Sequence, residues 1–165
     1  MTMAELNSLD RSGFVGALGW VFEQSPWVAE RAWDARPFAE LDALHAAMVE
    51  QVECATLAER LALLRAHPDL GARARLSPAS TTEQAGAGLD SLTRDEFERL
   101  HHLNGEYRER FGFPFLLAVK GSTKYDVLRA LAGRMESSPE EEYREALRQV
   151  YRIGRFRLEE TVGHG

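Results

Sequence analysis

Cysteine is almost absent from this sequence, since Cys54 is the only one among 165 residues. A single thiol cannot close an internal disulfide, and it excludes a zinc site built from several cysteines. This usage is consistent with a reducing compartment. Cys54 lies in a helical, apolar stretch, so we expect it to pack in the core rather than act as a nucleophile.

The sequence also lacks long hydrophobic runs and clustered positive charge. No apolar run approaches the length of a membrane span, and the N-terminal residues lack the hydrophobic centre of a signal peptide. The 20 Lys and Arg residues are scattered, and against 26 Asp and Glu residues they leave a net charge of −6. Because nucleic-acid binding needs a clustered basic surface, we expect neither nucleic acid nor a membrane as a partner.

Several common catalytic and cofactor-binding motifs are missing as well. The sequence has no His-Glu-x-x-His zinc motif, no glycine-rich phosphate loop and no Gly-x-Ser-x-Gly nucleophile motif. His101 and His102 are adjacent, so on a helix their side chains point about 100° apart and cannot share a metal ion. We therefore expect no metal site, and the possible chemistry narrows to acid–base and electrostatic work.

Helical periodicity runs along most of the chain. The content of 44% hydrophobic and 28% charged residues is typical of a soluble globular protein, and the length fits one domain with its own core. The periodicity predicts a single compact all-α domain, residues 1–165, of about eight helices. The clearest helical stretches run from about Asp10 to Gln24, from Ser25-Pro26 (with Ser25 as N-cap) to Arg36-Pro37, through Leu41, Leu44, Met48 and Val52, through Leu57, Leu61 and Leu64, from Thr93 to Phe111, from Tyr125 to Met135, and from Ser138 to about Thr161.

His67 stands at the end of one predicted helix, in the sequence His67-Pro68-Asp69-Leu70-Gly71. Pro68 disfavours a helical conformation for the residue before it, so we expect the imidazole to lie beside the helix end. Histidine is the side chain best suited to transfer a proton near neutral pH. His67 is therefore a candidate catalytic residue, and the alternative is that it packs against the helix or caps it.

Two long interruptions of the helical pattern, at residues 68–90 and 111–122, suggest a pocket, because sites tend to lie on loops held by a rigid scaffold. In the second interruption, Gly112 and Pro114 disfavour a helix within the apolar stretch 111–119. We expect this stretch to be extended and buried, without a partner strand. Its backbone groups then need other hydrogen-bond partners, some of which a bound ligand could supply.

Two polar side chains fall on otherwise apolar helical faces. Asn104 shares a face with Leu100 and Tyr107, and it would either tie down a neighbouring loop or line a pocket. Arg157 lies in the apolar stripe of the last helix, and a buried guanidinium keeps its charge and needs an anionic or carbonyl partner. That partner is either an internal carboxylate or a ligand.

A series of short motifs runs in one order through nearly the whole chain. The motifs are Ser25-Pro26-Trp27, Arg36-Pro37-Phe38, Ala66-His67-Pro68-Asp69-Leu70, Ser80, Glu83-Gln84, Ala87-Gly88-Leu89, Leu103-Asn104 with Tyr107, Phe111-Gly112-Phe113-Pro114-Phe115, Ala118-Val119 with Gly121, and Arg157-Leu158. Each piece is weak alone, but the combination is specific. It resembles the family of 2-oxo-4-hydroxy-4-carboxy-5-ureidoimidazoline (OHCU) decarboxylases.

This resemblance implies an all-helical, commonly homodimeric enzyme that needs no cofactor. Its small-molecule substrate is OHCU, which the family converts to (S)-allantoin and CO2 in the last step of urate degradation. The resemblance implies that His67 is the catalytic acid/base. The residues that it places in the substrate pocket are Pro68, Ser80, Glu83, Gln84 and Arg157, together with the backbone of Phe115, Leu116, Leu117, Ala118 and Val119. Ser80 and Glu83 also have the spacing of a helix capping box, which is compatible with a ligand contact by Glu83.

The expected location is the bacterial cytoplasm. Eukaryotic members of the family are often peroxisomal. The residues Gly163-His164-Gly165 do not form the Ser-Lys-Leu peroxisomal signal, which favours the cytoplasmic assignment.

Two other functions compete with this interpretation. A non-enzymatic helical interaction module would expose an apolar groove, and His67 would be dispensable in it. A related acid–base enzyme of purine-ureide metabolism, such as an isomerase or a hydrolase, would use the same pocket. A panel of substrates would separate the second of these from a decarboxylase.

Overall fold

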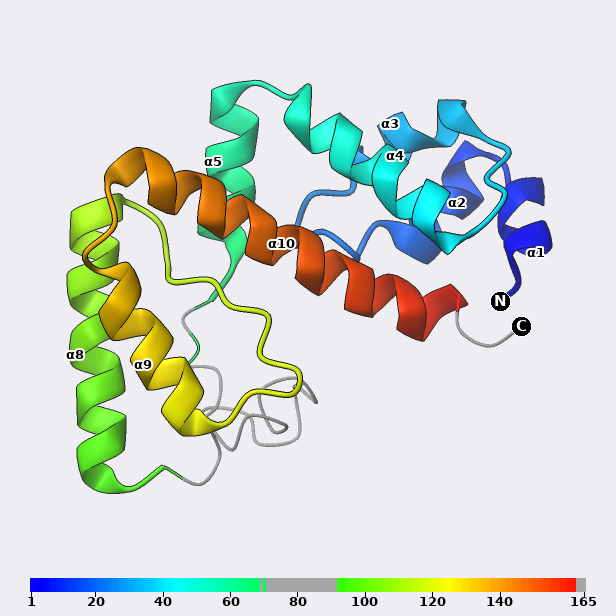
Figure 1. The fold of residues 1–165 in the computed structure, drawn as a ribbon. Coiled ribbons are helices and arrows are strands. Elements are labelled where there is room, and N and C mark those ends of the chain that lie inside the picture. Colours follow the sequence, from blue (N-terminus) through cyan, green and yellow to red (C-terminus); the bar gives the residue numbers. More distant parts are fainter. Residues whose placement is uncertain (69, 71–91, 163–165) are drawn as a thin grey trace. The chain divides into compact units, whose positions relative to one another are not determined.

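The computed structural model describes residues 1–68, 70 and 92–162 (Figure 1). Within these residues the chain forms eight α-helices and one 3-10 helix, and it forms no β-strand. The predicted all-α class is therefore confirmed. The chain divides into two compact units, of which the first comprises Met1–Ala66 with Tyr151–Gly165 and the second comprises His67–Val150. The extent of the predicted domain, residues 1–165, stays a prediction.

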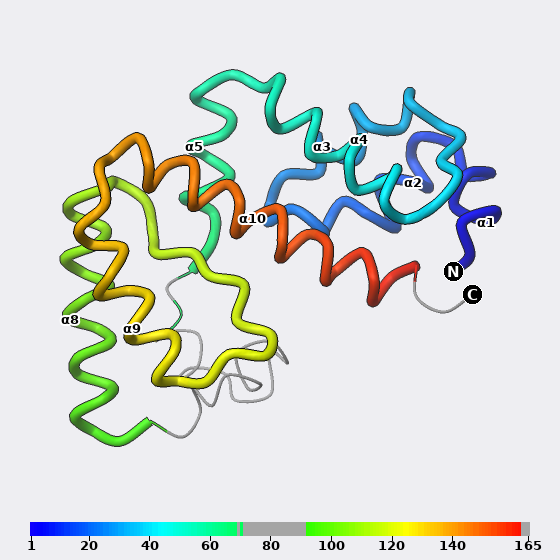
Figure 2. Tube along the Cα trace, in the orientation of Figure 1, coloured from blue at the N-terminus to red at the C-terminus, as the bar shows by residue number. Residues whose placement is uncertain are grey.

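Most of the described helices follow the predicted stretches (Figures 1 and 2). The helices of the first unit are α1 (Met3–Ser8), α2 (Arg11–Leu18), α3 (Trp27–Ala32), the 3-10 helix η1 (Trp33–Ala35), α4 (Leu41–Glu53) and α5 (Leu57–Ala66). Those of the second unit are α8 (Arg94–Phe111) and α9 (Lys124–Arg134). The long helix α10 (Pro139–Val162) contributes its first half to the second unit and its second half to the first.

Side chains that accept hydrogen bonds from the first turn set where two of these helices begin. Thr93 and Glu96 form a reciprocal capping box at the start of α8. At the start of α10, the hydroxyl of Ser138 accepts the backbone N–H of Glu141. Both helix starts are confirmed where the sequence predicts them.

The first predicted helix is shorter than expected, because α2 ends at Leu18 and not near Gln24. Gly19 caps it, and Gln24 has a positive φ of 47°, a left-handed conformation that cannot continue an α-helix. The prediction that Ser25 caps the next helix is also wrong. Its hydroxyl donates to the carbonyl of Glu23, a local bond that competes with capping.

The apolar residues that mark α5 in the sequence differ in exposure, since Leu64 is buried and Leu57 is 58% exposed. The prediction that Cys54 packs in the core is wrong. Cys54 is exposed at the C-terminal cap of α4, where its thiol donates to the carboxylate of Glu50. The helix ends just before Cys54, so the thiol lies beyond the apolar stripe that we expected to bury it.

Each unit buries its own apolar core. The largest fully buried side chains of the first unit are Leu6, Phe14, Leu18, Phe22, Leu44, Met48, Leu63 and Leu64. Those of the second unit are Leu100, Tyr107, Phe115 and Leu131. Apolar burial of this kind is the main favourable contribution to folding.

Candidate active site

His67 lies directly after the end of α5, as the sequence predicts. The helix stops at Ala66, and the imidazole residue that follows is 6% exposed. Pro68 prevents the helix from continuing through His67. A buried imidazole at a helix end is held in one place and is shielded from bulk water, which suits a group that moves a proton.

The segment after α8 is buried and non-helical, which confirms the second predicted interruption. Gly112 ends α8 in the left-handed conformation, with a φ of 81°. The buried residues of the segment are Phe113, Pro114, Phe115, Leu116, Ala118 and Val119, while Leu117 is partly exposed. The segment has neither helical nor strand hydrogen bonding. The carbonyl of Val119 accepts the backbone N–H of Ser122 at 2.9 Å, and the other buried backbone groups depend on side chains or on a ligand.

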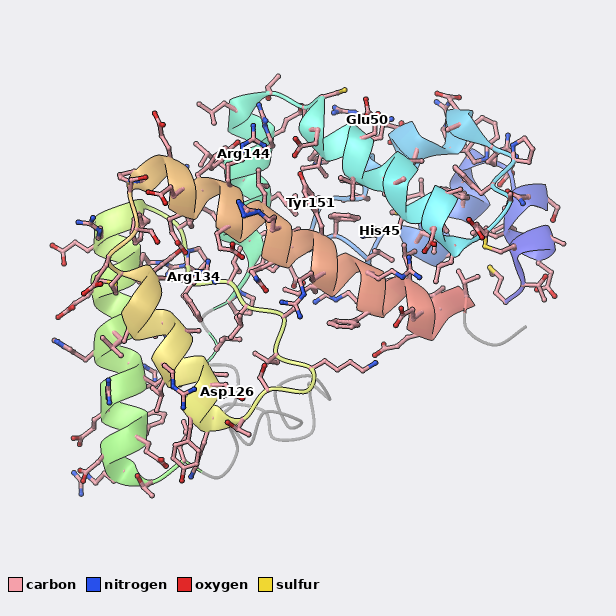
Figure 3. All side chains as sticks on the ribbon, viewed as in Figure 1. His45, Glu50, Asp126, Arg134, Arg144 and Tyr151 are labelled. Atoms are coloured by element: carbon pink, nitrogen blue, oxygen red, sulfur yellow. The ribbon has the colours of Figure 1, made fainter. Side chains whose placement is uncertain are left out.

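Two side chains bond this backbone directly. A terminal nitrogen of Arg134 donates to the carbonyl of Leu116 at 2.5 Å. Figure 3 labels the side chain of Arg134. The backbone N–H of Ala118 donates to the side-chain oxygen of Gln149 at 3.0 Å. Arg134 comes from α9 and Gln149 from α10, so two helices of the second unit hold the segment.

Arg134 is itself part of a buried polar cluster. Its guanidinium donates to the carboxylate of Glu142 at 2.5 Å, and the hydroxyl of Tyr107 donates to the same carboxylate at 2.5 Å. Glu142 and Tyr107 are both 0% exposed. Burial, and then the hydrogen bond to Glu142, raise the pKa of Tyr107 above its ordinary value, so the phenol stays protonated and remains a donor.

Sequence reasoning missed Arg134, Glu142 and Gln149. One signal was available, because Glu142, Ala146 and Gln149 recur at helical spacing and lie on the buried face of α10. Glu142 is, however, one of three glutamates in the first turn of α10, where acidic residues are ordinary and usually face solvent.

In the first unit, Arg157 is 7% exposed and has partners of both expected kinds. It forms an ion pair with Glu23 at 2.9 Å. It also donates to the carbonyl of Trp20 at 3.2 Å and, more weakly, to that of Val21 at 3.4 Å. The internal carboxylate predicted as one alternative is therefore present, and the ligand contact stays a prediction.

Asn104 is 3% exposed and lies on the buried face of α8, as predicted. Neither its side-chain oxygen nor its side-chain nitrogen has a hydrogen-bond partner among the described residues. The expected tie to a neighbouring backbone is therefore not formed within them. A buried amide without partners is costly and requires an explanation.

Three predicted pocket residues, Ser80, Glu83 and Gln84, lie outside the described residues. Among the residues that the structure describes, no group of three or more His, Cys, Asp or Glu side chains could hold a metal ion. No described helix is both long and apolar enough to cross a membrane. A surface pocket of the second unit, lined by Arg99, residues of α9 and Glu136, contains none of the predicted site residues.

Known proteins resemble this chain along nearly its full length. The family model for OHCU decarboxylase matches residues 7–159. The 2-oxo-4-hydroxy-4-carboxy-5-ureidoimidazoline decarboxylase of Haloferax volcanii is 48% identical over 160 residues, which cover 97% of this chain and 95% of that protein. The uric acid degradation bifunctional protein PucL of Bacillus subtilis is 45% identical over 98% of this chain, although the match covers only 33% of PucL.

A solved structure shares the fold. The crystal structure of (S)-allantoin synthase superposes with a TM-score of 0.83 at 36% identity over 98% of this chain. This chain spans about half of that one, since the match covers 54% of it. Family model, full-length relative and fold agree, and the chain belongs to the OHCU decarboxylase family.

Proposed function

We propose that this protein converts OHCU to (S)-allantoin and CO2, the last step in the degradation of urate to allantoin. The observation that carries the proposal is the match to an OHCU decarboxylase along 97% of this chain and 95% of its relative. The protein is accordingly a carboxy-lyase of this family. The formation of (S)-allantoin and the roles of individual residues are the parts that experiment must test.

The substrate can supply its own electron sink. OHCU carries a carboxylate and a hydroxyl on one ring carbon, and a ring C=N bond lies next to that carbon. When the bond to the carboxylate breaks and CO2 leaves, its electron pair moves into the C=N system. The reaction therefore requires no pyridoxal- or thiamine-type cofactor to accept the pair. The protein has to orient the ring, stabilise the developing charge and deliver a proton to one face.

His67 is the proposed acid/base. It takes or shares the proton of the substrate hydroxyl, and it then protonates the ring carbon that carries the ureido group. Delivery to one face produces the S configuration. Acid–base assistance of this kind accelerates reactions by about 10²–10⁴-fold. The burial of His67 at the end of α5 supports the role, because it fixes the imidazole in one position.

The other predicted residues have binding roles in this proposal. Glu83 and Gln84 hold ureido or ring N–H groups, and Ser80 and Pro68 complete the pocket with the backbone of Phe115–Val119. Arg157 binds a ring or ureido carbonyl. The carboxylate loses its negative charge as it departs as CO2. A tight ion pair between Arg157 and this carboxylate would therefore stabilise the ground state more than the transition state, and it would slow the reaction.

Two further properties of the family belong to the same proposal. We expect a homodimer, which sedimentation equilibrium would detect as twice the mass of one chain. We also expect the protein in the cytoplasm, which fractionation of the native host would test. The alternative of a non-enzymatic interaction module gains no support from the relatives, whose names are those of decarboxylases and uric acid degradation proteins.

The decisive experiment generates OHCU in place from urate with the two upstream enzymes and then adds this protein. Circular dichroism follows the handedness of allantoin, and CO2 release follows decarboxylation. We expect faster CO2 release and a persistent signal of one hand, with both lost in His67→Asn and both retained in His102→Asn. The imidazole of His102 is 71% exposed, which makes it a matched control. If the folded wild-type protein does not accelerate CO2 release, the proposed function is wrong.

A further inference from the structure

We propose that Arg134 and Gln149 are positioning residues, which fix the backbone of the segment Phe115–Val119 so that it can meet the substrate in one geometry. This inference rests on the proposed function, in which that backbone completes the substrate pocket. Neither side chain is assigned a contact with the substrate. Both act through the segment.

The segment needs such anchors because it has no regular secondary structure. Among the described residues, the groups that side chains anchor are the carbonyl of Leu116 and the N–H of Ala118. Between them lies Leu117, the one partly exposed residue of the segment. Among the described residues, no hydrogen bond reaches the backbone of Leu117. The anchored groups therefore flank the N–H and the carbonyl of Leu117, which remain available to a ligand.

The first anchor is held rigidly. The side chain of Arg134 is 13% exposed, and the side chain of its carboxylate partner, Glu142, is 1% exposed. The guanidinium also lies 4.5 Å from the centre of the Phe115 ring. A guanidinium has five N–H donors in a planar fork, so it can bond the carboxylate and the Leu116 carbonyl at the same time. A lysine at the same position could not span both acceptors in this way.

The second anchor is fixed in a different manner. The side-chain oxygen of Gln149 accepts the N–H of Ala118, and its side-chain nitrogen donates to the carboxylate of Glu145 at 2.7 Å. Because a carboxylate only accepts, Glu145 determines which end of the amide faces the segment. Gln149 is 7% exposed, so water has little access to replace the bond.

Loss of either hydrogen bond to the segment should change catalysis more than folding. A displacement of about 1 Å in a substrate-positioning group can reduce a rate about 10²-fold. A residue that only stabilised the fold would lower the folded fraction but leave the KM and kcat of the folded enzyme unchanged. Kinetic constants per folded molecule therefore separate positioning from mere stability.

The test of the second anchor uses an exchange of two side chains. Gln149→Met keeps the length of the side chain and removes the acceptor, and we expect kcat/KM to fall by about 10-fold or more. In the double variant Glu145→Gln with Gln149→Glu, the new carboxylate at position 149 accepts the N–H of Ala118. The new amide at position 145 donates to that carboxylate. We expect it to recover most of the loss. Arg129→Met, at a side chain that is 78% exposed, serves as the control.

The test of the first anchor must avoid an unpaired buried charge. Arg134→Met alone would strand the Glu142 carboxylate and could unfold the protein, so it is combined with Glu142→Gln. We expect the double variant to fold and to lose about 10-fold or more in kcat/KM. Arg129→Met is the matched control, because Arg129 lies on the same helix with its side chain 78% exposed.

The outcomes are distinct. Folded anchor variants with wild-type KM and kcat would overturn the positioning role and leave the proposed function intact. An inactive wild-type enzyme in the same assay would remove the proposed function and this inference with it. A loss in both anchor variants, with recovery in the exchanged pair and full activity in Arg129→Met, is the result we expect.

Discussion

The hydroxyl of Tyr107 donates to the carboxylate of Glu142 across 35 positions of sequence, and both residues are completely buried. The other carboxylate oxygen of Glu142 has no hydrogen-bond partner among the described residues. The carboxylate therefore depends on Tyr107 and Arg134. If this buried carboxylate loses one of its two donors, its charge is less well compensated, and the folded state becomes less stable.

Tyr107→Phe removes this donor and leaves the ring packing in place. We expect the free energy of unfolding to fall by about 1–3 kcal/mol, the usual cost of an unsatisfied buried group. Urea denaturation followed by circular dichroism measures it. Tyr125→Phe is the control, because Tyr125 is 59% exposed and should change nothing. Equal midpoints for the two variants would show that the hydrogen bond contributes nothing.

Gly154→Ala and Gly105→Ala should change stability in opposite directions. A Cβ atom at Gly154 would lie 3.2 Å from Cζ of Phe22, whereas one at Gly105 meets nothing within 4 Å. Phe22 is only 1% exposed and has little room to move, so we expect Gly154→Ala to destabilise by about 1 kcal/mol in spite of its better helix propensity. Gly105→Ala should stabilise by about 0.5–1 kcal/mol. Thermal unfolding of both variants tests the pair, and a shift of the same sign in both would contradict it.

Asn104→Leu tests whether the buried amide has a structural role or lines the pocket. The amide has no hydrogen-bond partner among the described residues. Its replacement by an apolar side chain of similar size should therefore cost the folded state little stability, and we expect an unchanged or higher Tm. If Asn104 lines the pocket, kcat/KM falls at the same time. A decrease in Tm equivalent to about 1 kcal/mol or more would instead indicate a structural hydrogen bond to a partner outside the described residues.

Glu59 should make stability depend on acid pH. The hydrogen bond from Arg31, and then that from the Thr56 backbone, lower the pKa of Glu59 from 4.5 to about 2. Because the folded pKa lies below the unfolded one, the contribution is complete above about pH 4.5 and is lost as pH falls towards 2. Glu59→Gln should therefore lower Tm at pH 7 and have a much smaller effect near pH 2.5. Glu98→Gln, at a carboxylate 64% exposed, is the control.

Arg157→Lys tests whether this guanidinium binds a substrate carbonyl or serves only in the ion pair with Glu23. If Arg157 binds a substrate carbonyl, we expect kcat/KM to fall by roughly 10- to 100-fold, the value of a hydrogen bond to a charged group. Glu23→Gln removes only the carboxylate of the ion pair at 2.9 Å. An equal loss in both variants would indicate that the ion pair alone matters. Nearly full activity in Arg157→Lys would exclude the carbonyl contact.

Features that depend on neighbouring residues were the ones that the sequence predicted well. The capping box of Thr93 and Glu96 is a local pattern, and so is the end of α5 before His67 and Pro68. The buried segment after Gly112 was predicted for the same reason, because glycine and proline interrupt a helix in a run of apolar residues.

Features that depend on tertiary packing were not predictable in this way. The exposed position of Leu57 is set by which face of α5 packs inward, and the sequence does not determine that face by itself. Arg134 and Glu142 looked like ordinary charged residues near helix ends. Their roles emerge only when Tyr107 of α8 and Arg134 of α9 both bond Glu142 of α10, and Arg134 also bonds the segment. The sequence pattern singled out His67 and Arg157 as candidates, and the family resemblance implied their roles, but neither indicated the side chains that hold the segment.

The anchoring of Phe115–Val119 by distant side chains also bears on how the protein folds. Leu116 is 18 positions from Arg134, and Ala118 is 31 positions from Gln149. Contacts across such separations form after the local helices, since closing the intervening loops costs entropy first. The segment should therefore become ordered late, with φ-values near zero, and substitutions within it should accelerate unfolding more than they slow folding. The kinetic lifetime of the native state then depends on the same bonds that shape the proposed pocket.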